Sequence, residues 1–254
     1  MFWRILEIGY SKGMKIDFIN LETVSSTNTW AKENAPQFNP GHLTCITALE
    51  QTAGRGRQEK KWISPKASNL YTTVYFTVPE NATYLPNLGQ IMALACAKIL
   101  ISLHVPTQIK WPNDILVHTK KIGGVLTETI PHKKSIAVII GLGLNVNMPE
   151  TILQTIDKPA TSLHLALHKN LDPSTLLHPL IKLFILHLTQ LQLQGFAPFQ
   201  KQFNDLLAYK GQPITVHLPT KKIEGICDTI TPDGCLKLLL PSGKSLTLST
   251  GEIL

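Results

Sequence analysis

The chain has 254 residues, 43% of them hydrophobic, so it can bury the core of one large domain and one smaller domain. Its formal net charge of +7 is modest for this length; it suits phosphorylated ligands or an acidic partner protein and does not by itself indicate nucleic acid. No apolar run approaches the roughly 20 residues that span a bilayer, and the four cysteines form no CxxC pair. We therefore expect reduced thiols, no membrane association and a cytoplasmic location.

The first fourteen residues precede the first clear strand pattern, and either Met1 or Met14 is the start. Arg4 and Glu7 interrupt the apolar part of this segment, which therefore does not fit a signal peptide. Residues 15–20 alternate as a strand does. A short helix is then expected over residues 27–34, with a serine before it as the N-cap and Pro36 at its end.

The next segments alternate between strand and helix patterns. Residues 43–50 and 69–78 are rich in β-branched and aromatic side chains, which predicts two strands. Residues 85–104 have apolar side chains at helical spacing, which predicts a core helix. Shorter strands are expected over residues 107–111 and 122–128. Residues 135–147 are almost continuously apolar, as in a central strand covered on both faces.

The C-terminal part begins with two predicted helices and ends in short strands. Asp172 and Pro173 are typical of a helix start, so we expect one helix over residues 174–193 and another over residues 196–209. Four strand patterns follow at residues 213–218, 222–230, 235–240 and 244–249, separated by proline and glycine turn signals. This pattern predicts a small antiparallel barrel, with a domain boundary near residues 209–212.

Residues 50–65, with the sequence EQTAGRGRQEKKWISP, combine two glycines, two arginines and two lysines with one tryptophan. Glycine lets a backbone approach a ligand closely, and arginine pairs bidentately with carboxylate or phosphate. The loop is therefore suited to an anionic ligand that carries a flat ring. The alternative is a solvated basic turn between two strands.

Three further motifs have a chemical and a structural interpretation. Asn113 and Asp114 follow a proline and either form an Asx-turn or present polar groups at a strand end. Lys121 comes just before a pair of glycines that marks a bulge or a close backbone approach. Gly141 and Gly143 leave one strand face bare, either for a ring or acyl chain or for tight packing.

The order of these motifs resembles that of biotin protein ligases, also called biotin–[acetyl-CoA-carboxylase] ligases. The resemblance rests on the GRGR loop with its tryptophan and SP, and on SSTN at residues 25–28, KWPNDI at 110–115, KKIGGVLTE at 120–128, GLGLNVN at 141–147, and Ser249 with GEI at 251–253. It covers nearly the whole chain from about residue 15. It implies an α+β fold: a mixed-sheet catalytic domain of the class II synthetase and biotin–lipoate ligase type over residues 15–208, and an SH3-like domain over 209–254. Residues 1–14 form an N-terminal extension too short for the DNA-binding helix-turn-helix of larger members.

The resemblance also implies a reaction in two steps. Biotin and ATP form biotinyl-5'-AMP and pyrophosphate, and the biotinyl group then passes to a specific lysine of a biotin carboxyl carrier protein domain, in acetyl-CoA carboxylase or a related carboxylase. Mg²⁺ is expected with ATP, and no dedicated protein metal site is expected. We expect no DNA partner and leave a homodimer open.

The roles implied for individual residues follow the same resemblance. Three are catalytic: Lys121 would bridge the biotin carboxylate and the α-phosphate, Arg57 would fold with Arg55 over the adenylate, and Asp114 would orient the incoming lysine and accept its proton. The implied biotin-binding residues are Ser26, Thr27, Asn28, Gln51, Gly54, Arg55, Gly56, Arg57, Lys121, Gly123, Gly124, Gly141 and Gly143. The implied ATP-binding residues are Arg55, Arg57, Trp62, Lys110, Asn113, Lys121 and Asn145.

One position departs from the family pattern, because Glu59 stands in the loop where a glycine is usual. Two rival interpretations also remain. A lipoate–protein ligase or octanoyltransferase shares the catalytic fold, but the GRGR loop and the small C-terminal barrel favour biotin. A non-catalytic regulator that binds biotin or a nucleotide is the second rival.

Overall fold

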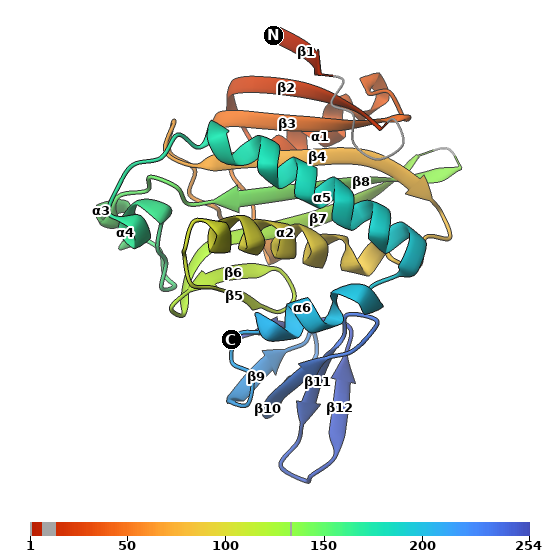
Figure 1. Ribbon diagram of the computed structural model, residues 1–254, viewed down its shortest axis with the longest axis vertical. Coiled ribbons are helices and arrows are strands. Elements are labelled where there is room, and N and C mark those ends of the chain that lie inside the picture. Colours follow the sequence, from red (N-terminus) through yellow and green to blue (C-terminus); the bar gives the residue numbers. More distant parts are fainter. Residues whose placement is uncertain (1, 7–13, 133) are drawn as a thin grey trace.

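A mixed sheet of eight strands forms the centre of the larger domain (Figure 1). The computed structural model describes residues 2–6, 14–132 and 134–254. Only β2 and β3 pair in parallel, and the other neighbouring strands of the sheet are antiparallel. In spatial order the strands are β1 (Phe2–Leu6), β2 (Lys15–Val24), β3 (His42–Gln51), β4 (Leu70–Pro79), β8 (Ser135–Leu144), β7 (Lys120–His132), β6 (Asp114–Val117) and β5 (Thr107–Lys110).

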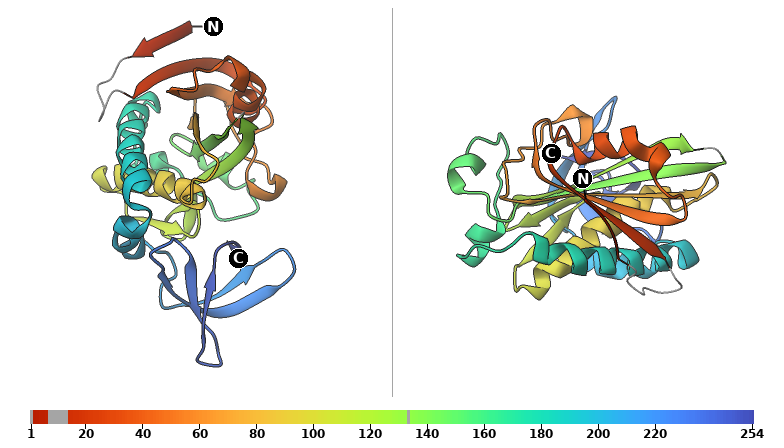
Figure 2. Two further views of the ribbon diagram at one scale, coloured as in Figure 1. Left: turned by 90° about the vertical axis from the view of Figure 1, so that its right-hand side faces the viewer. Right: turned by 90° about the horizontal axis from the view of Figure 1, so that it is seen from above.

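Helices cover both faces of this sheet. The long helices α2 (Leu88–Ser102) and α5 (Ser174–Gln194) pack on one face, and α1 (Thr27–Asn34) lies on the other, as the view from above in Figure 2 shows. The apolar side chains of α2 and α5 belong to the main core, whereas α1 packs with a smaller apolar cluster on the opposite face. The site described below is on the α1 face.

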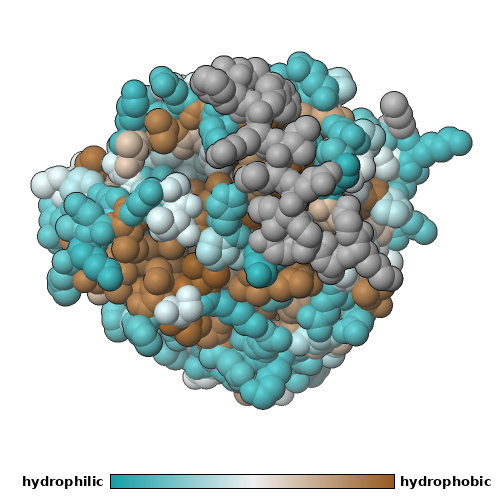
Figure 3. Space-filling model, turned by 45° about the horizontal axis from the view of Figure 1, so that its top comes forward, coloured by the Kyte–Doolittle hydropathy of each residue, from teal (hydrophilic) through white to brown (hydrophobic). Residues whose placement is uncertain are grey.

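Two helical segments, Leu85–Ser102 and Ser174–Gln194, are apolar and long enough to cross a membrane by length and composition. Both pack against the sheet and contribute buried side chains to the core. In the view of Figure 3 hydrophobic residues gather in a patch that hydrophilic residues border. Exposed Leu186 and Leu193 of α5 belong to the large hydrophobic side chains that remain accessible on this protein.

The smaller domain is an antiparallel sheet of five strands at the opposite end of the molecule from β1 (Figure 2). It rests on the larger domain through polar contacts, because Trp111 Nε1 and Gln90 Nε2 both donate to the carbonyl of Gly234, at 3.0 and 2.7 Å. Its strands, in the order β12 (Ser245–Leu248), β11 (Leu236–Leu239), β10 (Lys222–Ile230), β9 (Pro213–His217) and β13 (Glu252–Ile253), confirm the small C-terminal β-domain.

Most predicted elements appear within a few residues of their expected bounds, but the helix predicted over residues 196–209 is shorter than expected. A 3-10 turn (Ala197–Phe199) and the short helix α6 (Gln200–Asp205) occupy this segment. The chain then leaves the helix because its backbone pairs with β5: Ile109 N donates to Leu206 O at 2.7 Å, and Ala208 N donates to Ile109 O at 2.9 Å. Strands β1, β6 and β13 and the short helices α3 (Glu150–Leu153) and α4 (Leu163–Leu167) were not predicted.

The helix starts differ in detail from expectation. Ser26 is the N-cap of α1 with an extended backbone, but its side chain makes no capping hydrogen bond. At α5 the Asp172 carboxylate does accept from Ser174 N, at 2.9 Å. Ser26 also lines the cavity described below.

Candidate active site

A cavity of about 560 Å³ lies between the α1 face of the sheet, the basic loop after β3 and residues 155–160. Its floor is the bare strand face that the sequence predicts. A Cβ added to Gly141 would lie 2.3 Å from Asn28 Oδ1, and one added to Gly143 would lie 2.4 Å from Trp62 Cε2. The predicted site residues that line it are Ser26, Thr27, Asn28, Gln51, Arg55, Gly56, Arg57, Trp62, Lys110, Asn113, Asp114, Lys121, Gly124, Gly141, Gly143 and Asn145.

Two predicted site residues are placed elsewhere. Gly123 alternates with Gly124 along β7 and therefore faces the opposite side, where an added Cβ would lie 3.2 Å from Ile115 Cδ1. Gly54 lies inside the loop, where a Cβ would lie 2.5 Å from the carbonyl oxygen of Trp62. Neither glycine lines the cavity in this structure, so their contact with a ligand stays a prediction.

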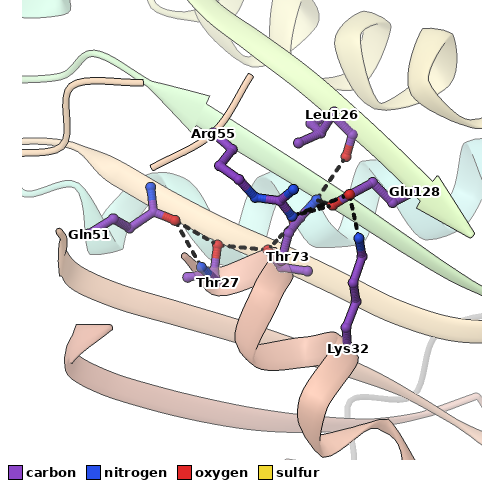
Figure 4. A network of polar contacts seen from close by, with 8 residues as sticks. Thr27, Lys32, Gln51, Arg55, Thr73, Leu126 and Glu128 are labelled. Carbon is purple, nitrogen blue, oxygen red and sulfur yellow. Dashed lines mark hydrogen bonds and ion pairs between the residues drawn. The ribbon is translucent and has the colours of Figure 1, made fainter. Parts of the chain in front are cut away.

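A chain of uncharged polar groups forms one end of the cavity (Figure 4). Gln51 Oε1 accepts from the backbone N–H and the hydroxyl of Thr27, at 2.9 and 3.1 Å. Thr73 Oγ1 lies 2.8 Å from Thr27 Oγ1 and 2.7 Å from Asn28 Oδ1. Gln51 Nε2 donates to Ser64 Oγ at 2.9 Å, so the orientation of the Gln51 amide is defined. Thr73 was not predicted, because it lies within an ordinary strand pattern.

Glu128 contacts this end of the site through Asn28. The sequence analysis includes Glu128 only as the last residue of the KKIGGVLTE motif and predicts no role for it. Its carboxylate accepts from Asn28 Nδ2 at 2.8 Å, from Lys32 Nζ at 2.5 Å and from Arg55 Nη2 at 3.2 Å (Figure 4). Burial alone raises the pKa of Glu128, but the hydrogen bonds from Lys32 and Asn28 and the nearby cations outweigh burial, so its pKa is lowered. Glu128 therefore remains ionised at neutral pH.

The opposite end of the cavity is cationic. Lys121 Nζ lies 2.6 Å from Asp114 Oδ1, and Lys110 Nζ lies 3.7 Å from Asp114 Oδ2, so one carboxylate faces two ammonium groups. Burial lowers the pKa of Lys110, and Asp114 offsets part of that effect. The ammonium of Lys121 also lies 5.5 Å from the centre of the Trp62 ring. These groups can bind an anionic ligand beside the Trp62 ring, which covers the backbone of Gly143.

The basic loop contacts the smaller domain as well as the cavity. Arg57 donates to Asn113 Oδ1 at 3.2 Å and to the carbonyl of Gly251 at 3.3 Å. Glu252 binds Lys60 at 2.6 Å and Lys158 at 3.1 Å. Glu252 is partly buried, but hydrogen bonds from the two lysines and their charges lower its pKa to about 2. No role was predicted from the sequence for Lys60, Lys158 or Glu252.

Two asparagines are expected to bind a ribose or a phosphate, but their side-chain N–H₂ groups already donate to backbone carbonyls of the protein. Asn113 Nδ2 donates to the carbonyl of Val125, and Asn145 Nδ2 donates to the carbonyl of Thr161 at 3.0 Å. Within the described residues Asn145 Oδ1 is buried and has no hydrogen-bond partner. Among those same residues no cluster of three or more His, Cys, Asp or Glu side chains has the arrangement of a metal site.

Comparison with known proteins shows to which family the chain belongs. The Biotin/lipoate A/B protein ligase family matches residues 21–145, and the Biotin protein ligase C terminal domain matches residues 210–254. The chain is 30% identical to the biotin--[acetyl-CoA-carboxylase] ligase of Paracoccus denitrificans over 232 residues, which cover 89% of this chain and 95% of that protein. The chain belongs to the biotin protein ligase family.

Other members of the biotin protein ligase family agree with this assignment. The bifunctional ligase/repressor BirA of Escherichia coli is 28% identical over 220 residues, or 86% of this chain and 68% of that protein. The biotin protein ligase from Aquifex aeolicus in complex with biotin and ATP superimposes with a TM-score of 0.77 at 29% identity, covering 93% of this chain and 97% of the other. The family membership confirms the predicted fold and places the C-terminal sheet in the domain typical of biotin protein ligases.

Proposed function

We propose that this protein activates biotin with ATP as biotinyl-5'-AMP and transfers the biotinyl group to a lysine of a biotin carboxyl carrier protein. One observation carries the proposal most directly. A single cavity joins an uncharged hydrogen-bonding end around Asn28 to a cationic end around Lys121, in a chain that belongs to the biotin protein ligase family. Biotin has matching chemistry, with a polar ureido ring at one end and a carboxylate at the other.

Proton counting at the uncharged end favours a ligand with N–H donors. Asn28 Nδ2 faces two pure acceptors, the Glu128 carboxylate at 2.8 Å and the Leu126 carbonyl at 3.3 Å. Asn28 Oδ1 must therefore face Thr73, whose single hydroxyl hydrogen also lies within reach of Thr27. Two acceptors share one hydrogen, so an acceptor remains for a ligand donor. A ureido N–H supplies that donor, whereas the dithiolane ring of lipoate does not.

The cationic end supports carboxylate activation. Attack of the biotin carboxylate on the α-phosphate of ATP concentrates negative charge where the two groups meet, and a preorganised ammonium stabilises that charge. Lys121 is suited to this role because Asp114 fixes its Nζ at 2.6 Å. Trp62, packed on Gly143, covers this part of the cavity and excludes water from the reactive anhydride. ATP would enter as its Mg²⁺ complex, with the metal bound by the phosphates.

The second step requires a neutral amine from the carrier lysine. In our proposal Asp114 orients this amine and accepts its proton while the acyl carbon is attacked and AMP leaves. The carboxylate lies at the start of β6 within the cavity wall, next to the proposed position of the adenylate. We place the reaction in the cytoplasm and propose neither a DNA partner nor a membrane partner.

Pyrophosphate exchange tests this proposal. Purified protein is incubated with ATP, Mg²⁺ and labelled pyrophosphate, with biotin or lipoate added in parallel. We expect exchange with biotin at micromolar concentration and little with lipoate, followed by labelling of a purified carrier domain. Exchange that prefers lipoate would assign the protein to the rival activity, and binding of biotin without any exchange would favour the non-catalytic regulator.

A further inference from the structure

Glu128 does not line the cavity, but two of the residues that bind its carboxylate do. Asn28 belongs to α1. Arg55 comes from the basic loop, and Glu128 itself lies on β7 (Figure 4). Its third partner, Lys32, does not line the cavity. One largely buried carboxylate, with 18% of the side chain exposed, thus joins three elements that approach the ligand from different directions.

The contact with Asn28 determines which side of its amide faces the cavity. A carboxylate accepts hydrogen bonds only, so Nδ2 turns toward Glu128 and Oδ1 turns toward Thr73 and the backbone of Gly141. An amide in the reversed orientation would direct two hydrogens at the cavity floor and would repel an N–H donor of the ligand. The acceptor character of this end therefore depends on the charge of Glu128.

The contact with Arg55 restrains a long and partly exposed side chain. Arg55 Nη2 lies 3.2 Å from each oxygen of Glu128, and 39% of the side chain is exposed. Without a fixed partner an arginine samples several rotamers, and ligand binding must then order it at a cost in conformational entropy. The pairing with Glu128 uses one terminal nitrogen and leaves the other N–H groups of the guanidinium for a ligand.

We infer that Glu128 is a positioning residue for adenylation: its carboxylate turns the acceptor side of Asn28 toward the cavity and orders Arg55 beside it, so that recognition of the ligand ring and of its activated carboxyl end depends on one side chain. This inference rests on the proposed function. The inference predicts that loss of the Glu128 charge impairs biotin activation more than loss of an ion pair that only joins a helix to the sheet.

The variant Glu128→Gln tests the inference with almost no change in shape. The glutamine amide has one oxygen that accepts and one N–H₂ group that donates. Its N–H₂ group must therefore face another donor, either Nδ2 of Asn28 or the cations of Lys32 and Arg55. We expect the KM for biotin in pyrophosphate exchange to rise roughly 10-fold or more, as for a buried polar group left mispaired. The kcat should fall as well, because Arg55 loses its restraint.

Lys32→Gln is the matched control, because it removes a partner of the same carboxylate and leaves the contacts with Asn28 and Arg55. We expect its KM for biotin to change less than about 3-fold, as for an ion pair at the edge of the site whose lysine side chain is 31% exposed. The double variant Asn28→Asp with Glu128→Gln restores a donor–acceptor match and returns an oxygen to the cavity floor. It should bind biotin more tightly than either single variant, although the Leu126 carbonyl loses its donor.

These measurements separate the inference from the proposed function. Exchange in the wild-type protein with an unchanged KM in Glu128→Gln would overturn the inference alone. Equal losses in Lys32→Gln and Glu128→Gln would also overturn it, because Glu128 would then only anchor α1. If Glu128→Gln fails to fold, the double variant Asn28→Asp with Glu128→Gln provides the test. The inference would be overturned if this double variant folds but binds biotin no more tightly than Asn28→Asp alone. Lack of any exchange by the wild-type protein would reject the proposed function and this inference together.

Discussion

The indole of Trp62 packs directly on the bare backbone of Gly143, so closely that a Cβ at that glycine would lie 2.4 Å from Cε2 and 2.5 Å from Nε1. The indole comes from the basic loop and the glycine from the central strand β8. This contact closes one side of the cavity and places the ring 5.5 Å from the Lys121 ammonium. The absence of a side chain at Gly143 is therefore a condition for loop closure.

Gly143→Ala should displace Trp62 from the strand, because overpacking of this kind costs about 1–3 kcal/mol. We expect the KM for biotin to rise by roughly 10-fold and the tryptophan fluorescence to change. Gly41→Ala is the control, since its added Cβ would approach no closer than 3.4 Å and its turn lies outside the cavity. Wild-type kinetics in Gly143→Ala would show that loop closure does not need this contact.

Lys121→Ala should abolish adenylate formation. Loss of a preorganised charge at a developing anion lowers a rate about 100- to 1000-fold. The neighbouring Lys110 does not replace it, because its ammonium donates to the carbonyl of Ile253 at 3.1 Å. Single-turnover formation of biotinyl-AMP measures the effect, with the exposed Lys120→Ala as control. A Lys121→Ala protein that forms the adenylate near the wild-type rate would contradict this role.

Asp114→Asn should impair transfer to the carrier more than adenylation. The amide cannot accept a proton from the attacking amine. Adenylation should also decrease, because Lys121 loses the carboxylate that lies 2.6 Å from its Nζ. Transfer from preformed biotinyl-AMP to a carrier domain isolates the second step. If the rates of adenylation and of transfer fall equally, Asp114 only positions Lys121 and does not accept the proton of the amine.

Glu252→Gln should destabilise the protein in a pH-dependent way. The folded-state pKa of Glu252 is lowered from 4.5 to about 2, so its stabilisation is fully present above about pH 4.5 and is lost as the pH falls toward 2. We expect a decrease of about 1 kcal/mol in the free energy of unfolding near neutral pH, kept small because both lysine partners are about half exposed.

Urea unfolding of wild-type and Glu252→Gln proteins between pH 3 and 7 measures this effect. The difference between the two proteins should shrink at the acidic end of the range. Asp205→Asn is the control, since its pair with Lys201 is highly exposed and should contribute less than about 0.5 kcal/mol. A difference that stays constant with pH would mean that the charge of Glu252 is not the cause.

Gln58→Gly should relieve backbone strain in the basic loop. Glu59 stands where the family usually has a glycine, and the structure does not describe its side chain. The residue of this loop with a left-handed backbone conformation is instead Gln58, with φ of 54° and ψ of 40°. That conformation costs a residue with a Cβ about 1–2 kcal/mol, which the greater freedom of glycine in the unfolded chain partly offsets.

We expect the free energy of unfolding to rise by up to about 1 kcal/mol in Gln58→Gly and to fall in Gln58→Val, because β-branched residues tolerate positive φ poorly. Slower release of biotinyl-AMP from Gln58→Gly would show that the same strain loosens the closed loop. Equal stability of the glycine and valine variants would mean that the loop does not contribute to the global free energy of unfolding.

Local sequence patterns were enough to predict the long strands, the long helices and the strand face that lines the cavity. Strands and long helices follow from local apolar periodicity, so β3, β4, β8, α2 and α5 were predicted within a few residues. The alternation of Gly141 and Gly143 predicted a bare strand face because side chains alternate along any strand. The failures came where local pattern competes with tertiary pairing, as in residues 206–208, which leave a helix to pair with β5.

The ion partners of the carboxylates depend on long-range contacts that local sequence patterns do not contain. Glu128 meets Lys32 and Arg55 across 96 and 73 residues of sequence, and Glu252 meets Lys60 across 192. No periodicity connects such positions, because the identity of an ion partner depends on how distant strands and loops are brought together. The sequence showed that the chain carries the charges for binding an anion, and the fold decided which carboxylates hold those charges in place.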